Sequence, residues 1–177
     1  MRKTLKQISD QLVEWEGKIL PCTVGRNGFS NDKKEGDGCT PTGTWKLLSV
    51  YYPADKIPKP KTVLPTIEIT PGMGWSDDPK DTAYNTCVQL PYTHSHEGLW
   101  REDDLYYLFI TISHNTNPVV AGKGSGIFIH RMRPEGTPTA GCLALSFEDL
   151  MHLVETATLD THWVIDKNLA GTPDITH

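Results

Sequence analysis

His130 and Cys142 are the residues of this sequence whose types and spacing best suit nucleophilic catalysis. His130 ends an apolar run, and Cys142 follows Gly141 on the far side of a loop. A cysteine thiol has a pKa of roughly 8.5, and a neighbouring imidazole can accept its proton or stabilise the thiolate. Gly141 permits a sharp turn, so amide N–H groups around Ala140, Gly141 and Cys142 can converge on a developing oxyanion. The same pair also fits a structural interpretation, in which Cys142 is a small buried hydrophobe and His130 a surface residue.

Two neighbouring strands are expected to position this pair. Residues 126–130 predict a short buried strand, because β-branched and aromatic residues in a run of this length fit a strand better than a helix. Residues 131–139 contain prolines and a glycine, so they predict a loop that folds back and brings Cys142 beside His130. Residues 108–114 predict a second strand that pairs with the first like a hairpin. This pairing places three further side chains near the face of His130: Tyr107, His114 and Ser125.

The segment after Cys142 predicts a helix. Ser146 can cap its first turn together with Asp149, and residues 150–154 give an apolar stripe. We expect residues 143–145 to lead directly into this helix.

The remaining chain predicts mostly strands and turns. Residues 11–20 indicate a hairpin around a Glu16–Gly17 turn, although the apolar residues from Leu5 to Trp15 also have helical spacing. Residues 72–85 predict a loop with a solvated acidic cluster. Residues 26–43 predict a solvated turn that borders the substrate cleft. Further strands are expected at residues 44–52, 66–70 and 163–165.

The run His130…Thr139-Ala-Gly-Cys142-Leu-Ala-Leu145 resembles the signature of the L,D-transpeptidase catalytic domain, also called the YkuD-like family. Other segments look like the same branch of that family, in the same order: residues 34–43, 74–79, 84–85, 97–106 and 122–126. The resemblance spans residues 22–164. It implies a mainly β fold, a YkuD-like sandwich or barrel of mixed strands with one or two short helices, one of which follows Cys142.

The resemblance implies a cysteine acyl transferase that acts on peptidoglycan stem peptides without a cofactor. Cys142 attacks the carbonyl of the third residue of a tetrapeptide, the terminal D-alanine leaves, and an acceptor amine resolves the thioester. In the family a backbone carbonyl after the histidine, here that of Arg131, orients the imidazole. Gly141 supplies the geometry of the turn. Hydrolysis of the same thioester by water, as in an L,D-carboxypeptidase, and a non-catalytic cell-wall-binding module are the alternatives.

Substrate contacts are expected from the residues around this pair. Arginine side chains can pair with carboxylates through two parallel hydrogen bonds, which makes Arg101, Arg131 and Arg133 candidates. The common form of the motif carries a histidine and an arginine or asparagine where this sequence has Ala140 and Ala144. The full set of expected substrate-binding residues is Thr139, Ala140, Ser125, Arg133, Arg101, His114 and Tyr107.

Length and composition set the remaining expectations. The 177 residues predict a single domain, residues 1–177, with a core over about residues 12–166, and we expect a monomer. A net charge of −5 argues against a nucleic-acid partner. The histidines lack the spacing of a zinc site, so no metal is expected. The four cysteines are expected to be thiols: Cys22, Cys39, Cys87 and Cys142.

The sequence gives opposing indications about location. Polar residues after Met1 interrupt any apolar signal segment, and no run approaches the roughly 18 apolar residues of a membrane-spanning helix. These features indicate a chain without a signal peptide or membrane-spanning segment. The substrate implied by the resemblance lies in the periplasm or cell envelope, and a cytoplasmic location is the alternative.

Overall fold

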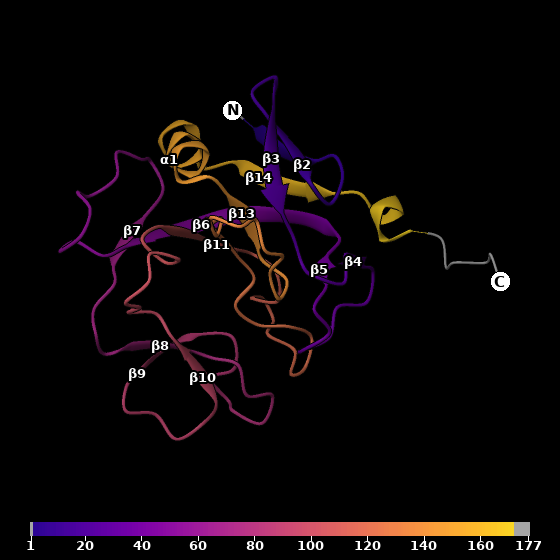
Figure 1. Cartoon of the computed structure of the whole chain (residues 1–177). Coiled ribbons are helices and arrows are strands. Elements are labelled where there is room, and N and C mark those ends of the chain that lie inside the picture. The colour runs from indigo at the N-terminus through magenta and orange to yellow at the C-terminus, as the bar shows by residue number, and fades with distance from the viewer. Residues whose placement is uncertain (1, 172–177) are drawn as a thin grey trace.

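A nine-stranded mixed sheet forms the body of the molecule in the computed structural model, which describes residues 2–171 (Figure 1). The strand order is β11-β12-β13-β3-β2-β1-β14-β6-β7, and β11 also pairs with β6, so the sheet folds back on itself. The strands of this sheet are β1 (Lys3–Gln7), β2 (Leu12–Trp15), β3 (Lys18–Thr23), β6 (Gly43–Tyr52), β7 (Thr66–Glu68), β11 (Phe109–Ile112), β12 (Phe128–Arg131), β13 (Leu143–Leu145) and β14 (Thr161–Ile165). The mainly β fold expected from the sequence is confirmed.

The expected hairpin near the N-terminus is confirmed. Strands β2 and β3 pair antiparallel, and the turn between them has positive φ at Glu16 (50°) and Gly17 (80°). A two-residue turn of this kind matches the twist of the strands that it joins.

The core begins earlier than the expected residue 12, because β1 is an inner strand of the sheet. It pairs parallel with β14 and antiparallel with β2, and Leu5 is fully buried. Its only other buried side chain is Gln7, which accepts a hydrogen bond from Trp163 Nε1 (3.0 Å) and donates one to Cys22 Sγ (3.3 Å). A buried glutamine breaks the apolar pattern from which a strand is recognised.

The helix expected after Cys142 is present, and it begins directly after the predicted cap. Residues 143–145 form strand β13, and helix α1 runs over Phe147–Thr156. Ser146 is the N-cap, with its Oγ accepting from the amide of Asp149 at 3.1 Å, as the sequence predicted. Residues 143–145 lead into the helix as expected, and they do so as a buried strand between β12 and β3.

A three-stranded sheet of β8 (Met73–Ser76), β9 (Cys87–Gln89) and β10 (His96–Gly98) lies below the main sheet in Figure 1. Part of the segment expected to be a loop is therefore strand β8. The acidic cluster is also not simply solvated, because Asp81 is buried and accepts hydrogen bonds from Ser76 Oγ (2.6 Å) and Tyr92 OH (2.5 Å).

Aromatic side chains fill a second apolar cluster between the two sheets. The rings of Phe109 and Phe128 stack at 4.5 Å, Tyr51 stacks on Phe109 at 4.7 Å, and Trp75 meets Phe128 edge-on at 4.9 Å. Cys142 belongs to the same buried cluster. The remaining elements are the short pair β4 (Phe29–Ser30) and β5 (Thr40–Pro41) and the 3-10 helix η1 (Lys167–Ala170). None of the described helices is long and apolar enough to cross a bilayer.

The position of β1 in the core predicts unequal costs for two leucine truncations. Leu5→Ala removes a fully buried side chain, so it should lower the free energy of unfolding by about 2–5 kcal/mol. Leu12→Ala is the matched control, because Leu12 is 40% exposed, and it should cost less than about 1 kcal/mol. Urea unfolding followed by circular dichroism measures both, and equal midpoints would contradict the placement of β1.

Candidate active site

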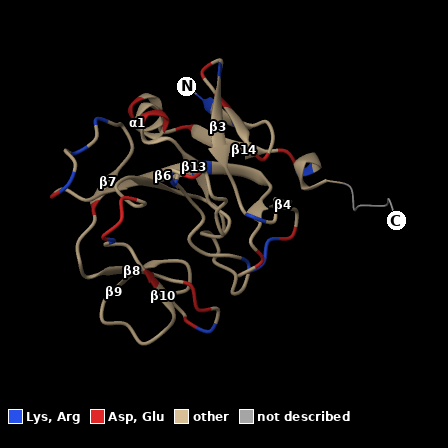
Figure 2. Ribbon diagram, viewed as in Figure 1, with Lys and Arg blue, Asp and Glu red and all other residues tan. Residues whose placement is uncertain are grey.

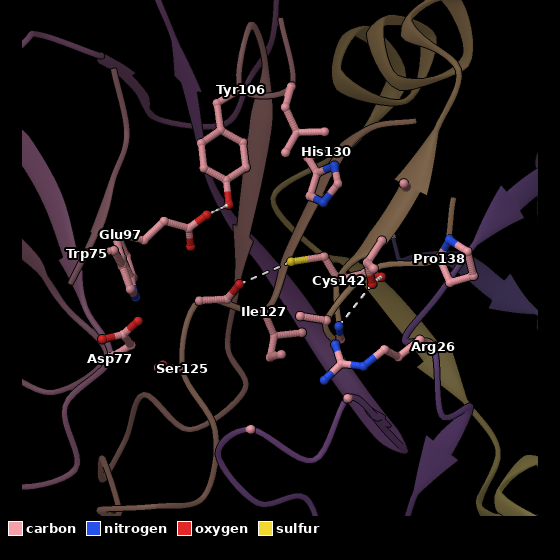
Figure 3. A pocket seen from close by; sticks show the side chains of 18 of the residues that line it. Arg26, Trp75, Asp77, Glu97, Tyr106, Ser125, Ile127, His130, Pro138 and Cys142 are labelled. Carbon is pink, nitrogen blue, oxygen red and sulfur yellow. Dashed lines mark hydrogen bonds between the residues drawn. The ribbon is translucent and has the colours of Figure 1, made fainter. Parts of the chain in front are cut away.

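A cavity of about 300 Å³ opens where β12 and β13 meet the loops around them (Figure 3). His130 comes from β12, and Cys142 stands directly before β13. Figure 3 shows the imidazole and the thiol on the same wall, with Glu97 and Asp77 across the cavity. The loop predicted from residues 131–139 therefore does bring the two groups together.

His130 is fixed as one tautomer by its own strand. Its ring is buried, and Nδ1 lies 2.8 Å from the main-chain oxygen of Arg131. Because a carbonyl oxygen only accepts hydrogen bonds, Nδ1 carries the proton and Nε2 keeps its lone pair. Burial lowers the pKa of His130 to about 4, despite the opposing contact with the Arg131 carbonyl. The imidazole is thus neutral at physiological pH.

Cys142 is also neutral in this structure. Its Sγ donates to the main-chain oxygen of Gly126 (3.1 Å) and accepts from the amide of Phe128 (3.2 Å). Burial raises the pKa of the thiol to about 12. Within residues 2–171 no hydrogen bond joins this thiol to the imidazole, so the resting pair is a neutral thiol beside a neutral base. All four cysteines are free thiols.

Two threonines brace the turn that presents Cys142. Thr139 Oγ1 donates to the carbonyl of Cys142 (2.7 Å) and accepts from the amide of Gly141 (3.0 Å). Thr40 Oγ1 donates to the carbonyl of Gly141 (2.7 Å) and accepts from the amide of Gly25 (2.9 Å). The turn is therefore tied both to its own loop and to the chain around β5.

Charged side chains of both signs line the cavity. The acidic ones are Glu35, Asp77 and Glu97, and the basic ones are Arg26, Lys33, Arg101 and Arg133. Glu97 accepts a hydrogen bond from the hydroxyl of Tyr106, and burial raises the pKa of its carboxyl. No group of three or more His, Cys, Asp or Glu side chains in the described part of the chain is arranged to hold a metal ion.

Most of the expected site residues line this cavity. They are Cys142, His130, Gly141, Thr139, Ala140, Ser125, Arg133 and Arg101. Two of them are already engaged by other side chains. The Ser125 hydroxyl donates to Glu35 (2.5 Å), and the Arg101 guanidinium makes two hydrogen bonds of 2.7 Å to Asp103.

Three expected contacts lie elsewhere. The Arg131 guanidinium pairs with Asp104 at 2.9 Å, so only the carbonyl of Arg131 reaches the site. Tyr107 precedes β11 and packs its ring against the Lys56 ammonium at 5.3 Å. His114 follows β11, and antiparallel pairing places Phe109, not His114, opposite His130. The expectation that Tyr107 and His114 share the face of His130 is therefore wrong.

Sequence reasoning missed several residues that line the cavity. They are Arg26, Lys33, Glu35, Trp75, Asp77, Glu97 and Tyr106. Five of these residues lie inside segments that carried the family resemblance, and this was the signal that could have found them: Glu35, Trp75, Asp77, Glu97 and Tyr106. The others arrive through packing between distant loops, which no local pattern reports.

The family model of the L,D-transpeptidase catalytic domain (YkuD) matches residues 5–165. The chain belongs to the L,D-transpeptidase catalytic domain family. Among solved structures, the chain is similar to the crystal structure of the helical cell shape determining protein Pgp2 from Campylobacter jejuni, at 15% identity and a TM-score of 0.42. The match covers 92% of this chain and 46% of that one, so the chain spans less than half the length of Pgp2. Comparison with curated proteins gives no match.

The L,D-transpeptidase family match includes β12 and β13, the two strands next to the cavity wall that holds Cys142. It also begins at Leu5, within the strand that the sequence pattern left outside the core. The family fold and the buried sheet therefore agree on where the core starts.

The tight turn before Cys142 predicts a position-specific cost for a methyl group. A Cβ at Gly141 would lie 2.9 Å from both Cys39 O and Ile127 Cδ1, and φ there is +151°. Gly136→Ala is the control, because it also has positive φ but nothing within 4 Å of its Cβ position. Gly141→Ala should lower the free energy of unfolding by roughly 1–3 kcal/mol more than Gly136→Ala. Urea midpoints for the two variants test this, and the reverse order would show that the turn yields without cost.

Proposed function

We propose that this protein is a peptidoglycan L,D-transpeptidase that works through a thioester on Cys142. The observation that carries the proposal is the contact between His130 Nδ1 and Arg131 O. It leaves Nε2 as the free base on the wall that also holds the nucleophile (Figure 3). Family membership supplies the reaction class, and this geometry supplies the roles of the residues.

The reaction starts from the neutral pair. The thiol rotates from the Gly126 oxygen toward Nε2 of His130, which takes its proton as sulfur attacks the carbonyl carbon of the third residue of the donor stem. The tetrahedral oxyanion forms beside the turn of residues 140–142, where the backbone N–H groups of Ala140 and Cys142 stabilise it, since the amide of Gly141 already donates to Thr139 Oγ1. The imidazolium then gives its proton to the leaving amine of the terminal D-alanine. An acceptor amine attacks the thioester, transfers a proton to His130, and releases the thiol.

A neutral pair suits this sequence of steps. A thiolate held permanently in a buried site would need compensation for its lost hydration, and burial disfavours it here. When the proton leaves the thiol only as sulfur attacks, the negative charge develops on the oxyanion. Neither group then has to be charged in the resting enzyme. The cavity also matches the chemistry of the stem peptide, because it presents carboxylates and cations to a ligand that carries both amines and carboxylates.

The proposed substrate places the reaction in the cell envelope. Peptidoglycan stem peptides are the partner implied by the family, and they lie outside the cytoplasm. We therefore propose that the catalytic domain acts in the periplasm or cell envelope.

Mass spectrometry of the protein incubated with disaccharide tetrapeptide tests the nucleophile. We expect release of D-alanine and a transient adduct on Cys142. Both should be lost in Cys142→Ala, because no other cysteine of the described residues lines the cavity. Cys87→Ala is the control, since Cys87 lies in an exposed strand position outside the cavity, and its adduct and rate should be unchanged.

Product identity separates the outcomes. A cross-linked product from an added amine acceptor supports the transpeptidase. A tripeptide with no cross-link would identify the L,D-carboxypeptidase, and binding without D-alanine release would identify a non-catalytic cell-wall-binding module.

The pH dependence of acylation should reflect the neutral pair. The rate requires unprotonated His130, whose pKa is about 4, so it should be nearly constant from about pH 6 to 8 and fall only toward pH 4.

Stability falls over the same acidic range. Burial lowers the pKa values of His130 and His114 to about 4. Their contribution to the free energy of unfolding is therefore full above pH 6.5 and is lost as the pH falls toward 4.

Single-turnover rates of D-alanine release, with circular dichroism at each pH, measure this dependence. A folded protein whose acylation rate halves near pH 6.5–7 would contradict the assigned state of His130.

A further inference from the structure

Lys33 is the only lysine or arginine that is buried among residues 2–171. Its exposed fraction is 7%, and it lies in the loop between β4 and β5, which carries both acidic and basic residues (Figure 2). Burying an ammonium group is costly unless a partner compensates for its lost hydration. The fold therefore keeps a positive charge in the wall of the cavity despite the cost of removing the ammonium from water.

Asp37 is the partner that holds this ammonium. Lys33 Nζ lies 2.5 Å from Asp37 Oδ1. The same carboxylate accepts the amide of Cys39 at Oδ1 (2.8 Å) and the amide of Lys34 at Oδ2 (2.9 Å), so its orientation is set by the loop backbone. An ammonium has three N–H donors, and Asp37 is its one acceptor within the described residues. Two donors remain for a ligand.

The ammonium stands beside the residue that precedes the nucleophile. A Cβ built on Gly141 would lie 3.5 Å from Lys33 Nζ, while the stem of Lys33 packs against Gly124, with Cγ 3.0 Å and Cε 3.1 Å from a Cβ built there. Lys33 also acts electrostatically on Cys142, whose pKa is raised by burial and lowered in part by this charge. The positive charge is thus fixed close to the reacting sulfur.

We propose that Lys33, held by Asp37, is the carboxylate anchor of the cavity: its ammonium binds the terminal carboxylate of the acyl donor and so sets the scissile carbonyl at Cys142. The assignment rests on the proposed function, in which the residue that leaves is the last of the stem. Its carboxylate lies only one residue beyond the scissile carbonyl, roughly 4–5 Å away. A donor of that kind needs a cation near the nucleophile, and Lys33 stands there.

The other cations of the cavity fit this role less well. Arg26 and Arg133 are exposed, so water screens their charge. The Arg101 guanidinium keeps N–H donors beyond its two hydrogen bonds to Asp103, but its side chain is 29% exposed against 6% for Lys33, so water screens its charge more. Lys33 combines burial, a fixed position and free donors.

Binding in a Cys142→Ala background tests the anchor apart from turnover. Isothermal titration calorimetry compares disaccharide tetrapeptide with the same ligand whose terminal carboxylate is amidated. The free carboxylate should bind more tightly by on the order of 10- to 100-fold, because a charge-assisted hydrogen bond in a buried site is lost on amidation.

Lys33→Met in that background should reduce this preference to within about 3-fold. Lys33→Met leaves the Asp37 carboxylate without its partner. The double variant Lys33→Met with Asp37→Asn removes both charges of the pair, keeps the net charge of the loop, and should show the same loss of preference. Lys34→Met is the matched control. The Lys34 side chain is 67% exposed, so this variant should keep the preference for the free carboxylate. Thermal unfolding of each variant checks that the fold persists.

The two proposals fail in different ways. Equal binding of acid and amide, or a preference that survives in both Lys33 variants, overturns the anchor. A wild-type protein that shows the Lys33-dependent preference but releases no D-alanine supports the anchor and overturns the proposed catalytic function. With Cys142 intact, Lys33→Met should raise KM for the tetrapeptide with a free terminal carboxylate and leave KM for the amidated ligand nearly unchanged.

Discussion

The parallel pairing of β12 with β13 is the constraint on which the site depends. In this register His130 lies opposite Ala144, and the Phe128 amide reaches Cys142 Sγ at 3.2 Å. The proposed base and nucleophile therefore stand one strand across and two residues along, on the same face of the sheet, because side chains two apart on a strand point the same way. Parallel neighbours ordinarily need a long crossover. Here a short loop suffices, since Thr139 and Thr40 hold its end with hydrogen bonds to the carbonyls of Cys142 and Gly141.

Burial then determines the electrostatics of this pair. The same packing that fixes the two groups removes water from them, and both respond by staying neutral. A resting thiolate–imidazolium pair is disfavoured in such a place. Charge is instead held at the edge of the cavity by the Lys33–Asp37 pair, whose members satisfy each other and the loop backbone. The structure thus keeps the neutral thiol and imidazole apart from the charged pair at the edge of the cavity.

Local signals predicted the parts of the structure that local physics determines. The turn at Glu16–Gly17, the cap at Ser146 and the pairing of β11 with β12 each follow from a few adjacent residues, and each is present. The sequence missed β1, because Gln7 occupies an inward position that the apolar pattern assigns to a hydrophobe. It also missed the burial of Lys33 and Asp81, since a charge in a glycine-rich or proline-rich segment is ordinarily solvated. Such burial depends on partners brought from elsewhere in the fold, and only the assembled structure supplies them.

Glu35 shows how the two halves of the site are joined. Its carboxylate accepts the hydroxyls of Tyr84 (2.7 Å) and Ser125 (2.5 Å), and its amide donates to the carbonyl of Gly122 (2.8 Å). These contacts fasten the loop that carries Lys33 to the segment that leads into β12 and His130. A displacement of that segment would therefore move the base and the buried cation together. The ion pair between Lys123 and Asp32 (3.2 Å) joins the same two segments, so the position of β12 is coupled to that of the Lys33 loop through more than one contact.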